Sequence, residues 1–212
     1  MNQDNLKLVV FDLNETLISE NTWMELNLAM GVKPEEDEQF MRWYEEGVIS
    51  YEEGQRFLEK IYRLRGHGNK EKMIGAMKYS FRPGAEDLIE YLHSKGYTVA
   101  LLSGAIDLLV EKVAGEVKID LHGAHNQLEF DENGMFKRII CDGDDADFKL
   151  KKTREFAKSL GIEMNQIVCV GDSYNDVKIF NETGRGITFA DSKIADKAWK
   201  TVANLSEIKS LL

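Results

Sequence analysis

The chain has 212 residues, of which 43% are hydrophobic and 30% charged, a composition typical of a folded globular protein and not of a disordered one. Acidic residues outnumber basic ones, 37 to 27, and the net charge of −10 disfavours non-specific binding to nucleic acid or anionic lipid. No apolar stretch reaches the ~20 residues that span a bilayer, and the polar N-terminus lacks a signal-peptide core. The two cysteines, Cys141 and Cys169, lack the density of a disulfide framework. We therefore expect a cytoplasmic protein with neither nucleic-acid nor membrane partners.

The first predicted element is a buried strand over residues 6–11, where the sequence is mostly apolar. The next segment, residues 19–80, has helical periodicity and contains a capping box formed by Ser50 and Glu53. Because about 60 residues between two strands exceed a normal loop, this segment is interpreted as an inserted helical cap. The core of the cap is expected to come from aromatic and methionine side chains: Trp23, Met24, Met30, Met41, Trp43 and Tyr44.

Strand and helix patterns alternate from residue 81 to the C-terminus. Helices are predicted over residues 84–95, 105–114 and around 153–160, and strands over residues 97–102, 167–170 and 186–190. Residues 128–140 show the alternation of a small β-hairpin, with Asn133 and Gly134 at its turn. This order predicts an α/β fold with a parallel sheet, whose core is formed by residues 1–18 and 81–212.

Two of the predicted strands end in acidic residues. Asp12 follows the first strand, and Asp172 and Asp176 follow the strand over residues 167–170. Ligands gather at the carboxyl ends of parallel strands, and three carboxylates that meet there repel one another unless a cation or a proton lies among them. The alternative is a capped turn at each strand end, but acids at two strand ends favour a divalent cation such as Mg²⁺. The histidines show no metal-ligand spacing and are expected at the surface or in turns: His67, His93, His122 and His125.

Two further positions offer contacts to an anion. Ser103 and Gly104 follow a predicted strand and precede a predicted helix, where a hydroxyl and free backbone N–H groups can bind phosphate. Lys149 opens the helix that leads to the strand over residues 167–170, and its charge can balance the carboxylates. Each position also has a simpler interpretation, which is a plain turn for Ser103-Gly104 and a solvated helix face for Lys149.

Together these residues resemble the haloacid dehalogenase superfamily of Rossmann-like phosphohydrolases. Asp12 and Thr16 match its first motif, D-x-D-x-T, Ser103 matches the second, Lys149 the third, and the loop from Gly171 to Asp176 the fourth. The motifs occur in the order of the family and cover the whole predicted core. The helical segment after the first motif resembles the cap of the phosphoserine phosphatase subgroup.

The resemblance implies a three-layer, Rossmann-like parallel sheet with an inserted α-helical cap, and hydrolysis of a small phosphorylated metabolite. Asp12 would be the nucleophile and form an aspartyl-phosphate. Mg²⁺ would be held by Asp12, the backbone carbonyl of Asn14 and Asp172, with Asp176 as an indirect support. The phosphate would be bound by four residues: Thr16, Ser103, Gly104 and Lys149. Two cap residues, Glu20 and Arg56, would contact the leaving group.

Position 14 departs from the family motif, because it is asparagine where the phosphatases carry a second aspartate. The resemblance assigns that aspartate the role of general acid and base, a contribution typically worth ~10²–10⁴-fold. Three explanations are open: an engineered change, a natural variant that is slow or prefers good leaving groups such as acyl phosphates, or a 2-haloacid dehalogenase motif. Asp172 and Asp176 favour a Mg²⁺-dependent phosphatase over metal-independent dehalogenation. Asn14 also motivates an alternative of another class, a non-catalytic binder of a phospho-ligand.

Overall fold

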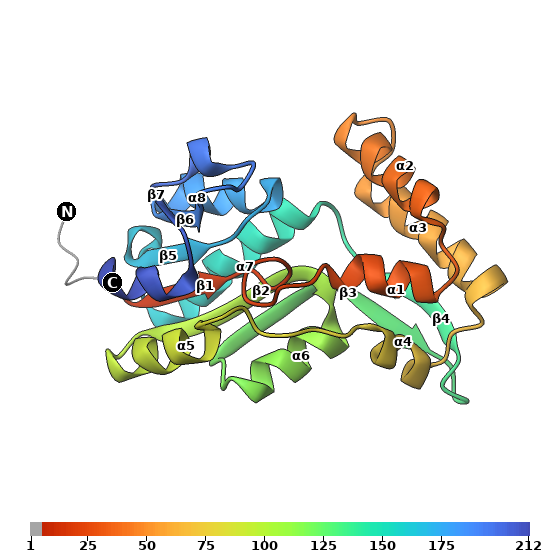
Figure 1. Cartoon of the computed structure of the whole chain (residues 1–212), viewed down its shortest axis with the longest axis horizontal. Coiled ribbons are helices and arrows are strands. Elements are labelled where there is room, and N and C mark those ends of the chain that lie inside the picture. Colours follow the sequence, from red (N-terminus) through yellow and green to blue (C-terminus); the bar gives the residue numbers. More distant parts are fainter. Residues whose placement is uncertain (1–5) are drawn as a thin grey trace.

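The computed structural model describes residues 6–212 and contains a central sheet, helices on both of its faces, and a group of helices beside β3 and β4 (Figure 1). The strands are β1 (Leu8–Phe11), β2 (Thr98–Ile106), β3 (Leu121–Phe130), β4 (Phe136–Ile140), β5 (Ile167–Val170), β6 (Gly186–Phe189) and β7 (Lys200–Val202). The sheet is flanked by α5 (Ala85–Ser94), α6 (Asp107–Glu116), α7 (Asp145–Leu160) and α8 (Val177–Thr183). The segment between β1 and α5 forms α1 (Thr22–Ala29), α2 (Pro34–Glu45), α3 (Tyr51–Ile61) and α4 (Lys70–Ala76). Among the described residues, no helix has the length and apolar character needed to cross a membrane.

The seven strands form one sheet in the order β4-β3-β2-β1-β5-β6-β7. Neighbouring strands are parallel except for β3 and β4, which pair antiparallel across a turn that contains Gly134. β1 lies in the middle, and its last residue, Phe11, is opposite Leu101 of β2 and Val170 of β5. The residues that follow β1 and β5 therefore meet at the same edge of the sheet, where ligands bind in parallel α/β folds.

Both faces of the sheet are covered, because alternate residues of each strand point to opposite sides. Val9 and Phe11 of β1 pack in a hydrophobic core with α5 and α6, whereas Leu8 and Val10 pack in a second core with α7 and α8. Every residue of β1 is buried, which explains why its sequence is apolar without alternation. The predicted α/β fold with a three-layer parallel sheet is confirmed.

The helices α1 to α4 are called the inserted helices below, and a polar contact at Asn27 joins α1, α2 and the end of α3. Tyr62 follows α3 in a short π-helical turn and is fully buried, and its hydroxyl donates a hydrogen bond to Oδ1 of Asn27 in α1. The side-chain amide of Asn27 donates to Oδ1 of Asp37 in α2 at 2.6 Å. Three segments that are distant in the sequence are thus tied together at one point.

The start of α6 differs from the sequence-based prediction. The helix begins at Asp107 and not at residue 105, because β2 continues to Ile106, which pairs with Asn126 of β3. Ser103 and Gly104 therefore lie within a strand whose register shifts after Ser103. The expectation that these two residues follow the strand and lie directly at a helix N-terminus is wrong.

The capping box predicted at the start of α3 is confirmed, but part of the hydrophobic core predicted for the inserted helices is wrong. Oγ of Ser50 accepts a hydrogen bond from the N–H of Glu53 at 3.2 Å, and Oε2 of Glu53 accepts one from the N–H of Ser50 at 2.8 Å. Met30 is buried as expected, but Met24 and Met41 are 47% and 53% exposed. These two methionines occupy the solvent-facing side of α1 and α2 and do not contribute to the core.

Replacing Tyr62 with phenylalanine tests the contact that joins the inserted helices. The change removes the hydroxyl and leaves Oδ1 of Asn27 without its donor in a buried position, so the free energy of unfolding should fall by about 1–3 kcal/mol. Urea unfolding followed by circular dichroism measures the change. Tyr174→Phe is the matched control, because Tyr174 is 64% exposed and its hydroxyl should matter by less than ~0.5 kcal/mol. Equal stability of the two variants would contradict this role of Tyr62.

Candidate active site

Three carboxylates meet at the carboxyl end of the parallel sheet. Asp12 directly follows β1, Asp172 and Asp176 follow β5, and oxygen atoms of the three side chains lie within 4.8 Å of one another. Asp12 and Asp176 are buried, and Asp172 is half-buried. The structure thus brings together the three acids that the sequence placed at two strand ends.

Lys149 lies against this cluster and uses all three donors of its ammonium group. The residue is on the second turn of α7, which begins four residues earlier at Asp145, and only 1% of its side chain is exposed. Nζ donates to Oδ1 of Asp12 at 2.7 Å, to Oδ1 of Asp176 at 2.8 Å and to Oδ1 of Asn175 at 3.0 Å. A buried charge is stable only when it is paired, and these three acceptors provide that pairing. The simpler interpretation, in which Lys149 lies on a solvated helix face, is therefore wrong.

Burial and crowding change the proton affinity of these groups. Burial raises the pKa of Asp12 well above its usual range; the nearby charges of Asp176 and Asp172 add to the rise, and Lys149 opposes it. Burial, with the charge of Asp176, also raises the pKa of Asp172 to about 6. Burial alone would lower the pKa of Lys149, but the attraction of Asp12 and Asp176 outweighs it and raises the pKa, so Lys149 stays protonated. The carboxylates carry more charge than one lysine balances, which favours a further cation.

The cluster offers only oxygen ligands, which suits a hard divalent cation. No described residue donates a hydrogen bond to Oδ2 of Asp12 or to Oδ2 of Asp172. Both oxygens of Asp176 are engaged: Oδ1 accepts from Lys149, and Oδ2 accepts from the N–H groups of Asp172 at 3.1 Å and Ser173 at 3.3 Å. The arrangement therefore favours Asp12 and Asp172 as direct ligands of a metal ion, with Asp176 in a supporting position.

Two of the predicted phosphate ligands, Thr16 and Ser103, have buried hydroxyl groups. Oγ1 of Thr16 donates to Oδ1 of Asp172 at 3.1 Å. Oγ of Ser103 accepts from the N–H of Ala105 at 3.0 Å, so its own proton is available to another acceptor. Both residues are nearly or fully inaccessible to solvent, with 0% exposure for Thr16 and 2% for Ser103. Ser103 can donate its proton to an anion without competition from bulk water, whereas Thr16 would first have to give up its bond to Asp172.

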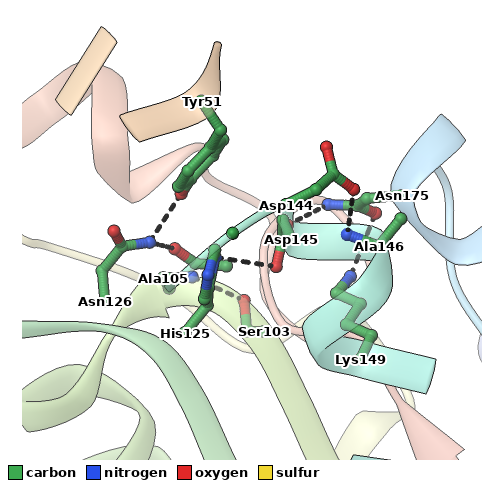
Figure 2. A network of polar contacts seen from close by, with 12 residues as sticks. Tyr51, Ser103, Ala105, His125, Asn126, Asp144, Asp145, Ala146, Lys149 and Asn175 are labelled. Carbon is green, nitrogen blue, oxygen red and sulfur yellow. Dashed lines mark hydrogen bonds and ion pairs between the residues drawn. The ribbon is translucent and has the colours of Figure 1, made fainter. Parts of the chain in front are cut away.

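The inserted helices reach the β2 side of the site through the carbonyl of Gly104. This carbonyl accepts from Nε1 of Trp23 in α1 at 3.0 Å and from Nδ2 of Asn126 in β3 at 2.6 Å. The same Nδ2 donates to the hydroxyl oxygen of Tyr51 in α3 at 2.6 Å (Figure 2). The peptide between Gly104 and Ala105 is therefore held directly by α1 and by β3, and indirectly by α3 through Asn126.

Asn14 is held by the first inserted helix. Its Oδ1 accepts from Oγ1 of Thr22 at 2.8 Å and from the N–H of Thr22 at 3.3 Å. Because a backbone N–H can only donate, the atom that faces Thr22 is the amide oxygen, and the amide nitrogen points away from Thr22. The neighbouring Glu15 is exposed and accepts from Nδ2 of Asn21 at 3.3 Å, so its carboxylate is directed to the start of α1. Position 14 thus offers an N–H donor where an acid would offer a proton.

Two of the predicted site residues do not contact the cluster in this structure. Glu20 accepts hydrogen bonds from the N–H and the hydroxyl of Ser80 at 2.8 and 2.6 Å, which lower its pKa. The side chain of Arg56 is 76% exposed and pairs with Glu52 of the same helix at 3.7 Å. Both belong to the segment between β1 and α5, and neither bonds to a carboxylate of the cluster.

Three polar residues in or next to the site were not predicted as site residues. Asn175 lies in the loop between Asp172 and Asp176, and the local sequence does not indicate which residues its side chain contacts. Asp145 is the first residue of α7 and is buried. His125 lies in β3 with only 1% of its side chain exposed, so the expectation of a surface or turn position is wrong for this histidine. Its neighbours in the sequence give no sign of its burial, which depends on helices far away in the chain.

This fold and cluster of residues belong to a known class of hydrolases. A family model described as haloacid dehalogenase-like hydrolase matches residues 6–184, which include every residue of the cluster. The chain therefore belongs to the haloacid dehalogenase-like hydrolase family.

Within this family the chain is similar to phosphoserine phosphatases. It is 33% identical over 201 residues to a probable phosphoserine phosphatase of Schizosaccharomyces pombe, a match that covers 89% of this chain and 65% of that relative. It is 30% identical over 191 residues to a phosphoserine phosphatase of Lactococcus lactis, a match that covers 90% of this chain and 86% of the relative. A solved structure described as a phospho-aspartyl intermediate analogue of phosphoserine phosphatase superposes with a TM-score of 0.81 at 28% identity, covering 98% of this chain and 99% of the other. These similarities indicate an enzyme of the phosphatase type.

The raised pKa of Asp172 predicts a pH-dependent gain in stability when its charge is removed. With a pKa of about 6 the folded state binds the proton of Asp172 more tightly than the unfolded chain does, so stability is lost as the pH rises from about 4 to above 6. In EDTA, Asp172→Asn should therefore raise the free energy of unfolding at pH 7.5 by about 1–3 kcal/mol, and the gain should vanish near pH 4.

Urea unfolding at both pH values measures this gain. Asp191→Asn is the control, because Asp191 is exposed and outside the cluster. A gain of the same size at both pH values, or in both variants, would contradict an electrostatic origin in the cluster.

Proposed function

We propose that the chain is a Mg²⁺-dependent phosphomonoester hydrolase whose nucleophile is Asp12. The observation that carries the proposal is the position of Asp12 at the end of the central strand, bonded to the buried ammonium of Lys149 and grouped with Asp172 and Asp176. The names of the relatives and of the similar solved structure support the reaction class.

In the proposed reaction, a carboxylate oxygen of Asp12 attacks phosphorus as the bond from phosphorus to the ester oxygen breaks, and the electron pair leaves with the alcohol oxygen. This step produces an aspartyl-phosphate. The alkoxide oxygen takes up a proton from solvent water, because the amide of Asn14 cannot supply one. Water then attacks the same phosphorus and releases a proton to the solvent, the bond to Asp12 breaks, and inorganic phosphate leaves with the carboxylate restored. Lys149 keeps Asp12 in one orientation and offsets the negative charge that gathers around the phosphoryl group.

The oxygen-only donor set fits Mg²⁺, which we propose is held by Asp12, Asp172 and the backbone carbonyl of Asn14. When bound, the ion would neutralise phosphoryl charge and orient the group for attack. Asp176 supports this site through its bonds to the Asp172 loop and to Lys149.

We assign the recognition of the phosphate to the groups that border the carboxylates: Thr16, Ser103, Gly104 and Lys149. Both hydroxyl groups are buried, that of Thr16 bonds to Asp172, and the backbone at Gly104 is fixed by Trp23 and Asn126. Donors that are already oriented cost little reorganisation when the phosphate binds.

The substrate is proposed to be a small phosphorylated metabolite of the cytoplasm, with phosphoserine as the first candidate. The relatives' names support this choice. We also propose that residues 19–80 act as a cap over the core of residues 1–18 and 81–212, and that Glu20 and Arg56 contact the leaving group. Both side chains have other partners in this structure, so these contacts require a movement of the inserted segment.

The phosphatase proposal predicts metal-dependent turnover that requires Asp12. Hydrolysis of p-nitrophenyl phosphate and of phosphoserine should need Mg²⁺, and Asp12→Ala should lower kcat on the order of 10³-fold or more because the covalent route is lost. Released phosphate is measured with and without EDTA. Phosphate release that survives EDTA would contradict the Mg²⁺-dependent mechanism, and release of chloride from chloroacetate in its place would favour dehalogenation. Phosphate binding without turnover of any substrate would favour a non-catalytic binder.

The neutral side chain at position 14 predicts slow turnover of substrates with poor leaving groups. Asn14→Asp should raise kcat by at least about 10-fold, because a carboxyl group can transfer the proton that an amide cannot. The gain should be larger for phosphoserine than for p-nitrophenyl phosphate, whose leaving group needs no proton.

Asn14→Ala serves as the control for this gain, since it removes the amide without adding an acid. If Asn14→Asp and the unchanged protein have equal kcat on phosphoserine, another group of the protein transfers the proton.

A further inference from the structure

We infer that Asp145 is a positioning residue that holds Lys149 in place through Asn175. The inference rests on the proposed role of Lys149 beside Asp12, and it concerns two residues outside the four motifs, Asp145 and His125. Figure 2 shows this chain, in which His125, Asp145, Asn175 and Lys149 follow one another across the junction of β3, α7 and the loop after β5.

The side-chain amide of Asn175 is fixed in orientation from both sides. Lys149 Nζ is 3.0 Å from Oδ1 of Asn175, and an ammonium can only donate, so the atom on that side is the amide oxygen. The amide nitrogen then faces Asp145 and donates to its Oδ2 at 2.5 Å. With a carboxylate on one side and an ammonium on the other, only one of the two orientations of this amide places a donor and an acceptor correctly.

Asn175 therefore supplies the third acceptor of a lysine that has three donors. The other two acceptors, Asp12 and Asp176, are charged and lie at 2.7 and 2.8 Å. If Asn175 turned away, one N–H of a buried ammonium would lose its partner, and Lys149 would shift toward the two carboxylates. Asp145 opposes this turn because it holds the amide nitrogen, and the hydroxyl of Ser173 donates to the amide oxygen at 2.7 Å.

The carboxylate of Asp145 occupies space that is free only because residue 104 is glycine. Asp145 is 5% exposed, and a Cβ added at Gly104 would lie 2.3 Å from Oδ2 of Asp145. Only glycine at position 104 leaves room for this carboxylate so close to the backbone of β2. The absence of a side chain at Gly104 thus serves Asp145 as well as the phosphate side of the site.

The second oxygen of Asp145 faces His125. Oδ1 of Asp145 lies 3.7 Å from Nδ1 of His125, and neither atom has a hydrogen-bond partner among the described residues. Nε2 of His125 is 3.1 Å from the carbonyl oxygen of Asp142, which can only accept, so Nε2 carries a proton. Without a further proton, a lone pair of Nδ1 would face a carboxylate. His125 therefore borders the oxygen of Asp145 that does not accept from Asn175.

His125 is kept in this orientation by two aromatic rings. The ring of Phe148 from α7 stacks on it at 5.0 Å between centroids, and the ring of Tyr51 from α3 lies at 4.9 Å on a tilted plane. The chain of contacts thus begins at an inserted helix and ends at Lys149 (Figure 2).

The experiment compares Asp145→Ala, Asn175→Ala and the double variant by two readouts. The first is the ¹⁵N resonance of the Lys149 ammonium, assigned by its absence in Lys149→Met. We expect this resonance to shift or broaden in both single variants. The second readout is kcat and KM for p-nitrophenyl phosphate, where kcat/KM should fall about 10- to 100-fold in each single variant. In the double variant both readouts should equal those of Asn175→Ala, because Asp145 acts through Asn175.

Two further variants keep the test decisive. Asp145→Asn retains an oxygen that can accept from Asn175, so it should restore most of the ¹⁵N signal and of kcat even if the alanine variant is poorly folded. Asp147→Ala removes an exposed carboxylate from the same turn of α7 and should leave both readouts unchanged.

An unchanged Lys149 resonance in folded Asp145→Ala, or additive losses in the double variant, would overturn the inference. The resonance also separates the two proposals, because it is measured without turnover. If the unchanged protein hydrolyses no phosphate ester, the proposed function fails, while the position of Lys149 is still tested.

Discussion

A buried ammonium that faces three acceptors is the interaction on which the rest of the site depends. Lys149 is almost fully buried, and moving an unpaired charge of this kind out of water costs several kcal/mol. The cost is offset only while Asp12, Asp176 and Asn175 stay within bonding distance. The carboxylates depend on the lysine in the same way, since their mutual repulsion and burial raise the pKa of Asp12. Neither the buried ammonium of Lys149 nor the buried carboxylates are stable at this site without the other.

The sheet topology makes such a contact possible, because it brings three distant segments to one level. β1 and β5 are parallel neighbours with Phe11 opposite Val170, and the N–H of Asp12 donates to the carbonyl of Val170 at 2.8 Å. Asp12 and the loop after β5 therefore begin at the same level along the strands, at the carboxyl edge of the sheet. α7 covers this face, and its start above the loop places Lys149 between the two strand ends. Parallel pairing of β1 and β5 thus positions the carboxylates, and the packing of α7 on the sheet positions Lys149.

The parts of this arrangement that depend on local sequence could be predicted. A buried apolar run followed by an acid marks a strand end, which is why Asp12 and Asp172 were found without any knowledge of tertiary structure. His125 could not be predicted, because it is buried by Tyr51 and Phe148, which are distant in the sequence. The start of α6 was missed for a similar reason. β2 extends to Ile106 only because β3 is there to pair with it.

The inserted helices contribute hydrogen bonds to the core and are more than a cover. Thr22 of α1 holds Asn14, Trp23 of α1 holds the carbonyl of Gly104, and Tyr51 of α3 contacts both Asn126 and His125. The contacts join the inserted segment to three separate parts of the site: the loop after β1, the bulged part of β2 and the chain of residues that leads to Lys149. A change in the inserted helices can therefore alter the geometry of the core without touching a carboxylate.

The contact between Thr22 and Asn14 also shows which property the asparagine changes. Thr22 donates twice to one side-chain oxygen, and an aspartate at position 14 could accept the same two hydrogen bonds with one of its carboxylate oxygens. The other oxygen would then occupy the place of the Asn14 amide nitrogen. Asparagine and aspartate are nearly identical in shape, so the anchor to α1 is compatible with both. The residue at position 14 thus leaves the framework of the site as it is, and decides whether a proton can be moved there.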